Sequence, residues 1–367
     1  MIHESYLHCH NKVYDMRELN KYGWNSSLQQ QKQKSNFAEL PHGRIAVTHK
    51  TCYDVITEDG LLSCELTGNM LYGREPSEYP CTGDWVILQK MDEEKGIILD
   101  MLPRQKALYR LKTGTVSEKQ AIASHIDKAF IVQSLDDNFN VRRIERFMLQ
   151  LADQNIESVI LLTKTDLGFD KDEVERALKH LSVNTPVLYT SVYAPESIEQ
   201  VRKFISKGET IVFTGSSGVG KSTLINALIG EQVFETSEIS DSTGKGRHTT
   251  TRREMILLEG SGVLIDTPGI KVFGVTNDDA NSLANVLNIS DFEGQCRYAD
   301  CQHVNENGCA VIAAVENGQL DADVYESYLK LRREAQHYSA SEYEKRQKGK
   351  ALAGVIKDMK KRGYKEL

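Results

Sequence analysis

Two short polar motifs in this chain have residue types and a spacing that suit the binding of a nucleoside triphosphate. The stretch from Gly215 to Ser222, GSSGVGKS, offers backbone N–H groups, a lysine and a hydroxyl side by side. The stretch from Thr163 to Asp166, TKTD, offers a carboxylate that can accept two hydrogen bonds from one edge of guanine. Adenine has no donors at those places, so the two motifs together predict a preference for GTP.

The first motif lies between a predicted strand and a predicted helix, which is the context that a phosphate-binding loop requires. A predicted buried strand at 210–213 precedes it, and a predicted helix from Ser222 to Ile229, closed by Gly230, follows it. Backbone N–H groups and the helix N-terminus favour phosphate there, while Lys221 can reach the outer phosphates and Ser222 can bind Mg²⁺. The nucleotide-binding residues predicted here are Thr214, Gly215, Ser216, Ser217, Gly218, Val219, Gly220, Lys221, Ser222 and Thr223.

Two segments downstream of the loop are typical of elements that sense a third phosphate. An apolar run leads to Asp266, whose carboxylate can hold Mg²⁺ through water, and the Gly269 N–H can contact the γ-phosphate. The polar run 244–251 contains threonines that can coordinate Mg²⁺ while the γ-phosphate is present. Thr250 and Thr251 are both candidates. An ordinary exposed loop is the alternative for this run, but the phosphate motifs on both sides argue against it.

The group that orients the attacking water is not where many GTPases carry it. Position 270 is Ile rather than the Gln that does this work in many of these enzymes. His248, in the polar run, is a candidate because an imidazole can orient water or move a proton. A solvated histidine and a site completed by a partner molecule are the alternatives. The predicted catalytic residues are His248, Thr250 and Asp266.

The motifs follow one another in an unusual order. Asp166 precedes the phosphate loop by 49 residues, whereas ordinary GTPases have the base-reading motif downstream of that loop. This order predicts a central α/β GTPase domain whose chain is circularly permuted. The usual Asn is replaced by Thr163, and the stem of Lys164 can pack along the base. A second strand leads to residues 190–192, which resemble a loop that contacts guanine through backbone N–H groups. The predicted base-binding residues are Thr163, Lys164, Thr165, Asp166 and Ser191.

Three cysteines and one histidine lie close together in sequence near the C-terminal end of the chain: Cys296, Cys301, His303 and Cys309. Three thiolates and one imidazole suit a closed tetrahedral Zn²⁺ site, which is structural rather than catalytic. A disulfide with one free cysteine is the alternative. The chain has seven cysteines, an odd number, and neither a secretory signal nor a long apolar segment. We therefore expect one structural zinc ion in a cytoplasmic protein.

The rest of the chain divides into segments that must position these motifs. Short predicted strands at 43–47, 53–56, 61–66, 85–89 and 96–102 favour a five-stranded OB-type β-barrel. Such barrels often bind oligonucleotides, although a purely structural barrel is an alternative. The sequence predicts a multidomain protein with a polar arm (1–38), the barrel (39–110), the permuted GTPase domain (111–275), a helical zinc domain (276–340) and a basic tail (341–367).

The distribution of charge is more informative than its sum. The net charge of −7 argues against a nucleic-acid partner, but residues 330–367 carry twelve Lys and Arg against five acidic residues. That segment is +7, which leaves −14 on residues 1–329. A basic segment can contact a phosphate backbone, although a solvated basic helix fits equally well. No membrane partner is expected.

Taken together, these residues resemble the bacterial family of ribosome small-subunit-dependent GTPase A (RsgA), over about residues 40–340. The resemblance rests on Gly83–Val86, on Gln120–Ala123 ahead of Asp127, on the order of the GTPase motifs and on the zinc spacing. It implies an OB-fold, a permuted GTPase domain and a zinc domain. It also places the family's catalytic histidine at His248. Residues 124–126 read Ser-His-Ile where Ala-Asn-Val is expected, which indicates a divergent member.

The resemblance implies a GTPase that is stimulated by the small ribosomal subunit during its late maturation. It implies GTP or GDP, Mg²⁺ and one Zn²⁺ as bound groups, with the subunit and its rRNA as partners of a monomeric protein. Two other functions remain open from the sequence. One is a GTP-gated RNA-binding switch whose hydrolysis is incidental, and the other is a GTPase that acts on a protein partner.

Overall fold

The computed structural model describes residues 18–71, 75, 77–111, 119–182, 185–232, 254–266 and 280–333. The chain divides into two compact units. The first covers Met1–Arg110 and Lys119–Val272, and the second covers Leu111–Glu118 and Phe273–Leu367. In the part of the chain that is described, no helix combines the length and the apolar composition needed to cross a membrane.

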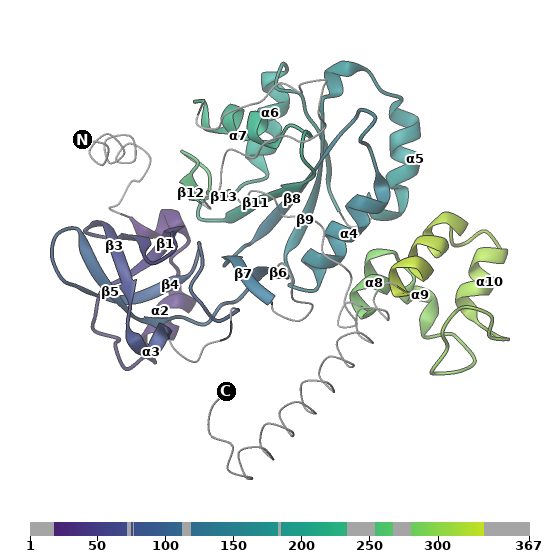
Figure 1. The fold of residues 1–367 in the computed structure, drawn as a ribbon. Helices are drawn as coiled ribbons and strands as arrows, with labels where there is room; N and C mark the ends of the chain where they lie inside the picture. Colours follow the sequence, from purple (N-terminus) through teal and green to yellow (C-terminus); the bar gives the residue numbers. More distant parts are fainter. Residues whose placement is uncertain are drawn as a thin grey trace, which may run out of the picture. The chain divides into compact units, whose positions relative to one another are not determined.

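A closed five-stranded barrel lies in the first unit (Figure 1). Its strands are β1 (His42–Thr48), β2 (Tyr53–Thr57), β3 (Gly60–Leu66), β4 (Trp85–Lys90) and β5 (Lys95–Met101). They pair in the order β1-β2-β3-β5-β4, and β4 pairs again with β1 to close the ring. Apolar side chains such as Ile45, Val55 and Leu88 fill the interior. The predicted barrel is confirmed, with every strand end within one residue of its predicted position.

The run Gly83–Val86 has a structural role in this barrel. Asp84 has a fully buried carboxylate that pairs with Arg104 through a 2.6 Å contact to Nη2 and a 2.8 Å hydrogen bond from Nε. Burial raises the pKa of Asp84, but the hydrogen bonds and charge of Arg104, together with hydrogen bonds from Ser124 and the Cys81 N–H, hold that pKa below its usual value. Gly83 has φ +99°, and a Cβ there would lie 2.4 Å from the Ser124 carbonyl oxygen, so only glycine fits.

The segment ahead of the barrel is packed by buried contacts over its described part. It contains the 3₁₀ helix η1 (Leu19–Tyr22) and helix α2 (Ser26–Gln33), with Leu28 buried. The Trp24 ring lies 4.8 Å from that of Trp85. Arg44, on β1, is buried and donates a hydrogen bond to the Tyr22 carbonyl. The polar composition of the predicted 1–38 arm did not indicate this packing.

A mainly parallel sheet forms the rest of the first unit. Its strands are β8 (Lys128–Ser134), β9 (Glu157–Thr163), β10 (Val187–Tyr189), β11 (Thr210–Gly215), β12 (Glu254–Leu257) and β13 (Val263–Asp266). They lie in the order β10-β9-β8-β11-β13-β12, and only β12 is antiparallel to its neighbour β13. Strand β12 also pairs with β1 of the barrel, opposite Val47, so that one sheet runs through both parts.

Helices cover the parallel strands, and the core lies between them (Figure 1). The helices are α4 (Val141–Ala152), α5 (Lys171–Ser182), α6 (Pro195–Lys203) and α7 (Lys221–Ile229). Helices α6 and α7 bury Val201 and Leu224 against Phe130 and Phe213, whose rings stack at 5.1 Å. Helix α4 packs on β8 and β9. The smaller elements are α3 (Gly68–Leu71), η2 (Thr165–Leu167) and the hairpin of β6 (Ala107–Leu111) and β7 (Lys119–Ser124).

The described part of the second unit is helical. It contains α8 (Ala280–Val286), α9 (Ser290–Glu293), α10 (Ala310–Glu316) and a further helical run at 322–333. Leu287, Val311 and Tyr328 are among its buried side chains. A helical C-terminal domain is what the sequence predicts, and the predicted basic tail (341–367) lies outside the described residues.

Candidate nucleotide site and metal centre

The register of the parallel sheet brings the two nucleotide motifs to the same edge. Strand β8 lies between β9, which ends at the base motif, and β11, which ends at the phosphate loop. Thr163 lies opposite Ser134, and Gly215 lies opposite Val132. The C-terminal edge of a parallel sheet is where ligands bind in α/β folds. The sheet therefore unites motifs whose order along the chain is permuted.

The phosphate loop begins at a position that only glycine can occupy. Gly215 has φ +152°, and a Cβ at this residue would lie 2.3 Å from the Val132 carbonyl oxygen. The loop then turns into α7 through Gly220, which has φ +88°. Ser217 and Gly218 are exposed, whereas Val219 is buried. The N-terminus of α7 consequently opens beside an exposed turn, which is an arrangement that attracts anions.

Lys221 lies in the loop with its amine against the loop backbone. Its Nζ donates to the carbonyl oxygens of Gly215, at 2.8 Å, and Ser216. Burial lowers the pKa of Lys221 to about 8, and the negative charge of Asp266 partly opposes that shift. Asp266 ends β13, next to β11, as predicted for a carboxylate at the phosphate edge. Ser222 lies in the first turn of α7.

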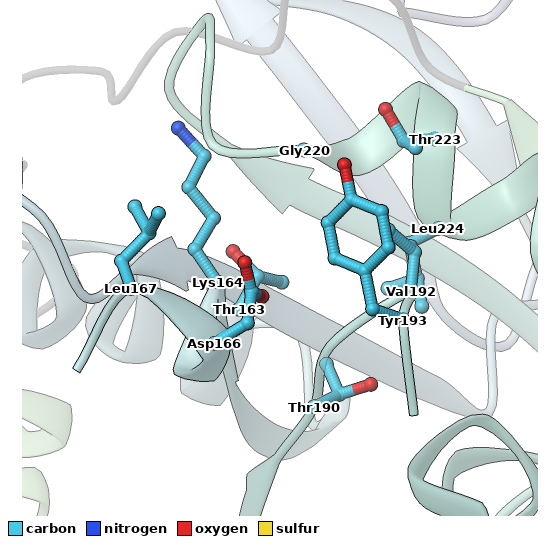
Figure 2. Close-up of a pocket in the computed structure, with 10 residues that line it drawn as sticks. All are labelled: Thr163, Lys164, Asp166, Leu167, Thr190, Val192, Tyr193, Gly220, Thr223 and Leu224. Carbon is cyan, nitrogen blue, oxygen red and sulfur yellow. The ribbon is translucent and has the colours of Figure 1, made fainter. Parts of the chain in front are cut away.

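A cavity of about 330 Å³ joins the two motifs. Its lining residues include Thr163, Lys164, Asp166, Tyr193, Gly220 and Thr223. Figure 2 shows these side chains around one space, contributed by the base motif, the loop after β10 and the phosphate loop. The cavity, hereafter the base pocket, can hold a planar base within reach of the Asp166 carboxylate.

Hydrogen bonds fix both charged residues of the base motif. The Ser191 hydroxyl donates to Asp166 Oδ1 at 2.5 Å. Lys164 has a left-handed backbone (φ +60°), and its Nζ lies 2.8 Å from Asp136 Oδ2. Burial raises the pKa of Asp136, but hydrogen bonds from Lys164, Ser134 and the Asn138 N–H, together with the Lys164 charge, lower it overall. The Lys164 amine is thus held by Asp136, and the aliphatic stem of Lys164 lies along the pocket (Figure 2).

Thr163, which replaces the usual Asn, connects the two motifs directly. Its side chain is buried, and its hydroxyl donates a 2.6 Å hydrogen bond to the Val219 carbonyl oxygen in the phosphate loop. The contact spans 56 positions in the sequence. The Asn side chain that is usual at this position is therefore replaced by a shorter hydroxyl side chain, whose hydrogen-bond partner lies in the phosphate loop.

Several predicted site residues lie outside the described residues: His248, Thr250, Thr251 and Gly269. Thr214 is buried at the end of β11, and Thr165 is half-buried in η2. The structure adds Asp136 and Ser197, which sequence reasoning missed. The Ser197 hydroxyl accepts from the Ser191 N–H at 3.1 Å. Neither residue belongs to a recognisable motif. Asp136 acts through Lys164, which is distant in sequence, and Ser197 acts through Ser191 across a turn.

The predicted metal ligands converge in the second unit. The ligand atoms of Cys296, Cys301, His303 and Cys309 all lie within 4.8 Å of one another. His303 Nδ1 lies 3.5 Å from Cys296 Sγ and 3.4 Å from Cys309 Sγ. The Ala310 N–H donates to Cys296 Sγ at 3.4 Å. Three sulfurs and one nitrogen in this arrangement fit a tetrahedral Zn²⁺.

A second layer orients the histidine of this cluster. Its other ring nitrogen, Nε2, lies 3.4 Å from Glu293 Oε1, which also accepts from the Tyr328 hydroxyl at 2.9 Å. A carboxylate on the far nitrogen fixes which nitrogen of a histidine faces a metal. The Tyr325 hydroxyl donates to the His303 carbonyl at 2.6 Å. No motif in the sequence indicates this role for Glu293, Tyr325 or Tyr328.

Comparisons with known proteins identify the family of this chain. The family model described as RsgA GTPase matches residues 101–276. A relative from Bacteroides thetaiotaomicron, named small ribosomal subunit biogenesis GTPase RsgA 1, is 59% identical over 344 residues, which cover 94% of this chain and 97% of that protein. One from Lactiplantibacillus plantarum, named small ribosomal subunit biogenesis GTPase RsgA 2, is 39% identical and covers 86% of this chain and 89% of that protein.

Two solved structures share the fold. The crystal structure of YjeQ from Thermotoga maritima has a TM-score of 0.60 at 24% identity and covers 81% of this chain and 98% of that one. The structure of YloQ, described as a circularly permuted GTPase, has a TM-score of 0.61 at 23% identity and covers 81% and 96%. Given this fold, the motif order and relatives that match nearly its whole length, the chain belongs to the RsgA family, whose members hydrolyse GTP.

Proposed function

We propose that this protein hydrolyses GTP to GDP and phosphate on the small ribosomal subunit and acts in the late maturation of that subunit. The observation that carries this proposal is the near-full-length similarity to a relative named small ribosomal subunit biogenesis GTPase. We further propose that contact with the subunit and its rRNA stimulates hydrolysis, and that the protein works as a cytoplasmic monomer.

In this proposal the phosphate loop holds the triphosphate. The N–H groups of residues 215–220 and the N-terminus of α7 bind phosphate oxygens, and Lys221 leaves the loop carbonyls to pair with the outer phosphates. Ser222 would hold Mg²⁺ directly, and Asp266 would hold it through water. The ion, when bound, neutralises charge on the β- and γ-phosphates. The exposed turn beside α7 and the charge of Asp266 near Lys221 support these roles.

The base pocket supplies the preference for guanine. Asp166 accepts from the guanine edge, Lys164 covers one face of the base with its stem, and Ser191 holds the Asp166 carboxylate in place. Thr163 acts by positioning, because its hydroxyl bonds the phosphate loop. The support for these roles is that Thr163, Lys164 and Asp166 line one cavity, and that Ser191 is hydrogen-bonded to Asp166.

Catalysis in this proposal depends on the segment that carries His248. That histidine orients the attacking water, and Thr250 or Thr251 completes the Mg²⁺ ligands when the γ-phosphate is present, together with the Gly269 N–H. The absence of Gln at position 270 supports the need for another group. In this proposal, docking on the subunit brings the segment that carries His248 into its catalytic position.

Turnover measurements test the proposed partner. We expect purified small subunits to raise the rate of GTP hydrolysis by at least about tenfold, because a completed transition-state site is worth orders of magnitude in GTPases. Large subunits should have little effect, and Lys221→Ala should abolish the stimulated rate. Stimulation by free RNA alone would favour the GTP-gated RNA switch, whereas no response to small subunits would contradict the proposal.

The lowered pKa of Lys221, about 8, predicts a pH dependence of nucleotide binding. Below that pH the Lys221 side chain of the free protein is already the ammonium ion that pairs with phosphate, so the Kd for GTP should not change with pH. Above it the lysine must take up a proton on binding, so the Kd for GTP should rise by about tenfold between pH 7 and pH 9. Fluorescence titrations with a labelled GDP and competing GTP measure this Kd. Lys221→Arg stays charged and should bind more weakly but without the rise, and a flat wild-type profile would rule the mechanism out.

The metal centre predicts about one equivalent of zinc per chain. Elemental analysis of protein purified without chelators should find it, and Cys309→Ala should lose it because three remaining ligands cannot close the site. Cys52→Ala is the matched control, since Cys52 lies between β1 and β2 of the barrel and should leave the zinc content unchanged. A wild-type content below about half an equivalent would contradict a resident ion.

A further inference from the structure

The loop after β10 places a large aromatic side chain at the mouth of the base pocket. Tyr193 is 82% exposed, more than any other exposed large hydrophobic side chain in the described segments. Single exposed hydrophobic residues are ordinary on protein surfaces. The position of this one is not, because it lines the same cavity as Lys164 and Asp166. Figure 2 shows the Tyr193 ring across that cavity from the Lys164 side chain.

The backbone that carries this ring is fixed to the residue that is proposed to read the base. The Tyr193 N–H donates to the Ser191 hydroxyl oxygen at 3.1 Å, and that hydroxyl donates to Asp166 Oδ1 at 2.5 Å. On the other side of the loop, the Ser197 hydroxyl accepts from the Ser191 N–H and donates to the Ala194 carbonyl, at 3.1 and 2.7 Å. The Ser191 hydroxyl is therefore hydrogen-bonded both to the Asp166 carboxylate and to the backbone of Tyr193.

A base that Asp166 holds by its edge has two flat faces. Each face is either covered by a protein side chain or exposed to water. The Lys164 stem lies on one side of the pocket, with its amine bound to Asp136 at 2.8 Å. The exposed ring of Tyr193 lies on the other side. Aromatic side chains stack on the faces of bases, and this stacking is tolerant of base identity because every base has such a face.

We propose that Tyr193 is the second wall of the base pocket and stacks on the guanine of GTP and GDP. This proposal rests on the assignment of Asp166 to the guanine edge. Tyr193 supplies affinity and Asp166 supplies selectivity, so the two residues have separable effects. Since the base is common to substrate and product, Tyr193 holds GTP and GDP alike.

Nucleotide affinity tests this assignment. Tyr193→Ala should raise the Kd for GDP and for GTP by about 5- to 150-fold, the range that one stacked base gives. Tyr193→Phe keeps the ring and should remain within about twofold of wild type. Phe37→Ala removes an aromatic side chain that is 38% exposed and does not line the pocket, so it should leave both values unchanged. A thermal unfolding curve for each variant confirms that it is folded.

Selectivity for the base distinguishes the role proposed for Tyr193 from the role proposed for Asp166. ITP lacks the exocyclic amine of guanine, so the ratio of the Kd values for ITP and GTP reports the edge contact. Tyr193→Ala should leave this ratio unchanged, and Asp166→Asn should reduce it. An unchanged Kd in Tyr193→Ala, or a loss in Tyr193→Phe as large as in Tyr193→Ala, overturns the stacking proposal alone. An unchanged ratio in Asp166→Asn instead overturns the base-pocket assignment on which the proposal rests.

A spectroscopic readout observes stacking directly. The chain has two tryptophans, Trp24 and Trp85, and both lie at the barrel. Tyr193→Trp adds an indole in the pocket whose fluorescence should fall on addition of GDP, because stacked guanine quenches it. The wild-type protein provides the background from the two barrel tryptophans. A Tyr193→Trp protein that binds GDP without additional quenching would contradict contact between the ring and the base.

Discussion

One buried hydrogen bond links the two halves of the nucleotide site, in addition to the sheet that brings them to the same edge. The Thr163 hydroxyl donates to the Val219 carbonyl at 2.6 Å, and both residues are buried. Thr163 ends the strand that leads to the base motif, and Val219 lies in the phosphate loop. A net hydrogen bond is worth about 1 kcal/mol, but a buried carbonyl left without its donor costs about 1–3 kcal/mol. We infer that the spacing between the base-reading residue and the phosphate-binding backbone depends on this contact as well as on the sheet.

The permuted order of the motifs has a consequence for how the parts of the first unit are connected. Along the chain, the barrel precedes the base-reading half. In the sheet, however, barrel strand β1 pairs with β12, and β12 pairs with β13, which ends at Asp266. The barrel is thus hydrogen-bonded to the phosphate edge of the sheet. We infer that a change at the phosphate edge can reach the barrel through β13 and β12 without passing through the base motif.

Much of this architecture could be predicted from the sequence, because it depends on local patterns. The barrel strands are short and separated by turn residues, and the phosphate loop and the zinc ligands have fixed spacings. The missed features depend on contacts between distant residues. The sequence shows that Thr163 replaces the usual Asn, but it does not indicate the hydrogen bond from Thr163 to Val219. Glu293 and Tyr193 carry no local signature, and the buried Leu28 and Trp24 were hidden in a polar segment.

The affinity of Thr163 variants for GDP tests most directly the claim that this hydroxyl unites the site. Thr163→Val keeps the shape of the side chain and removes the donor, and it should raise the Kd by about 5- to 150-fold, the equivalent of 1–3 kcal/mol. Thr163→Ser keeps the donor and should stay within about threefold of wild type. If Thr163→Val binds GDP as tightly as the wild-type protein does, the base motif and the phosphate loop are held together by the sheet alone, and the claim is wrong.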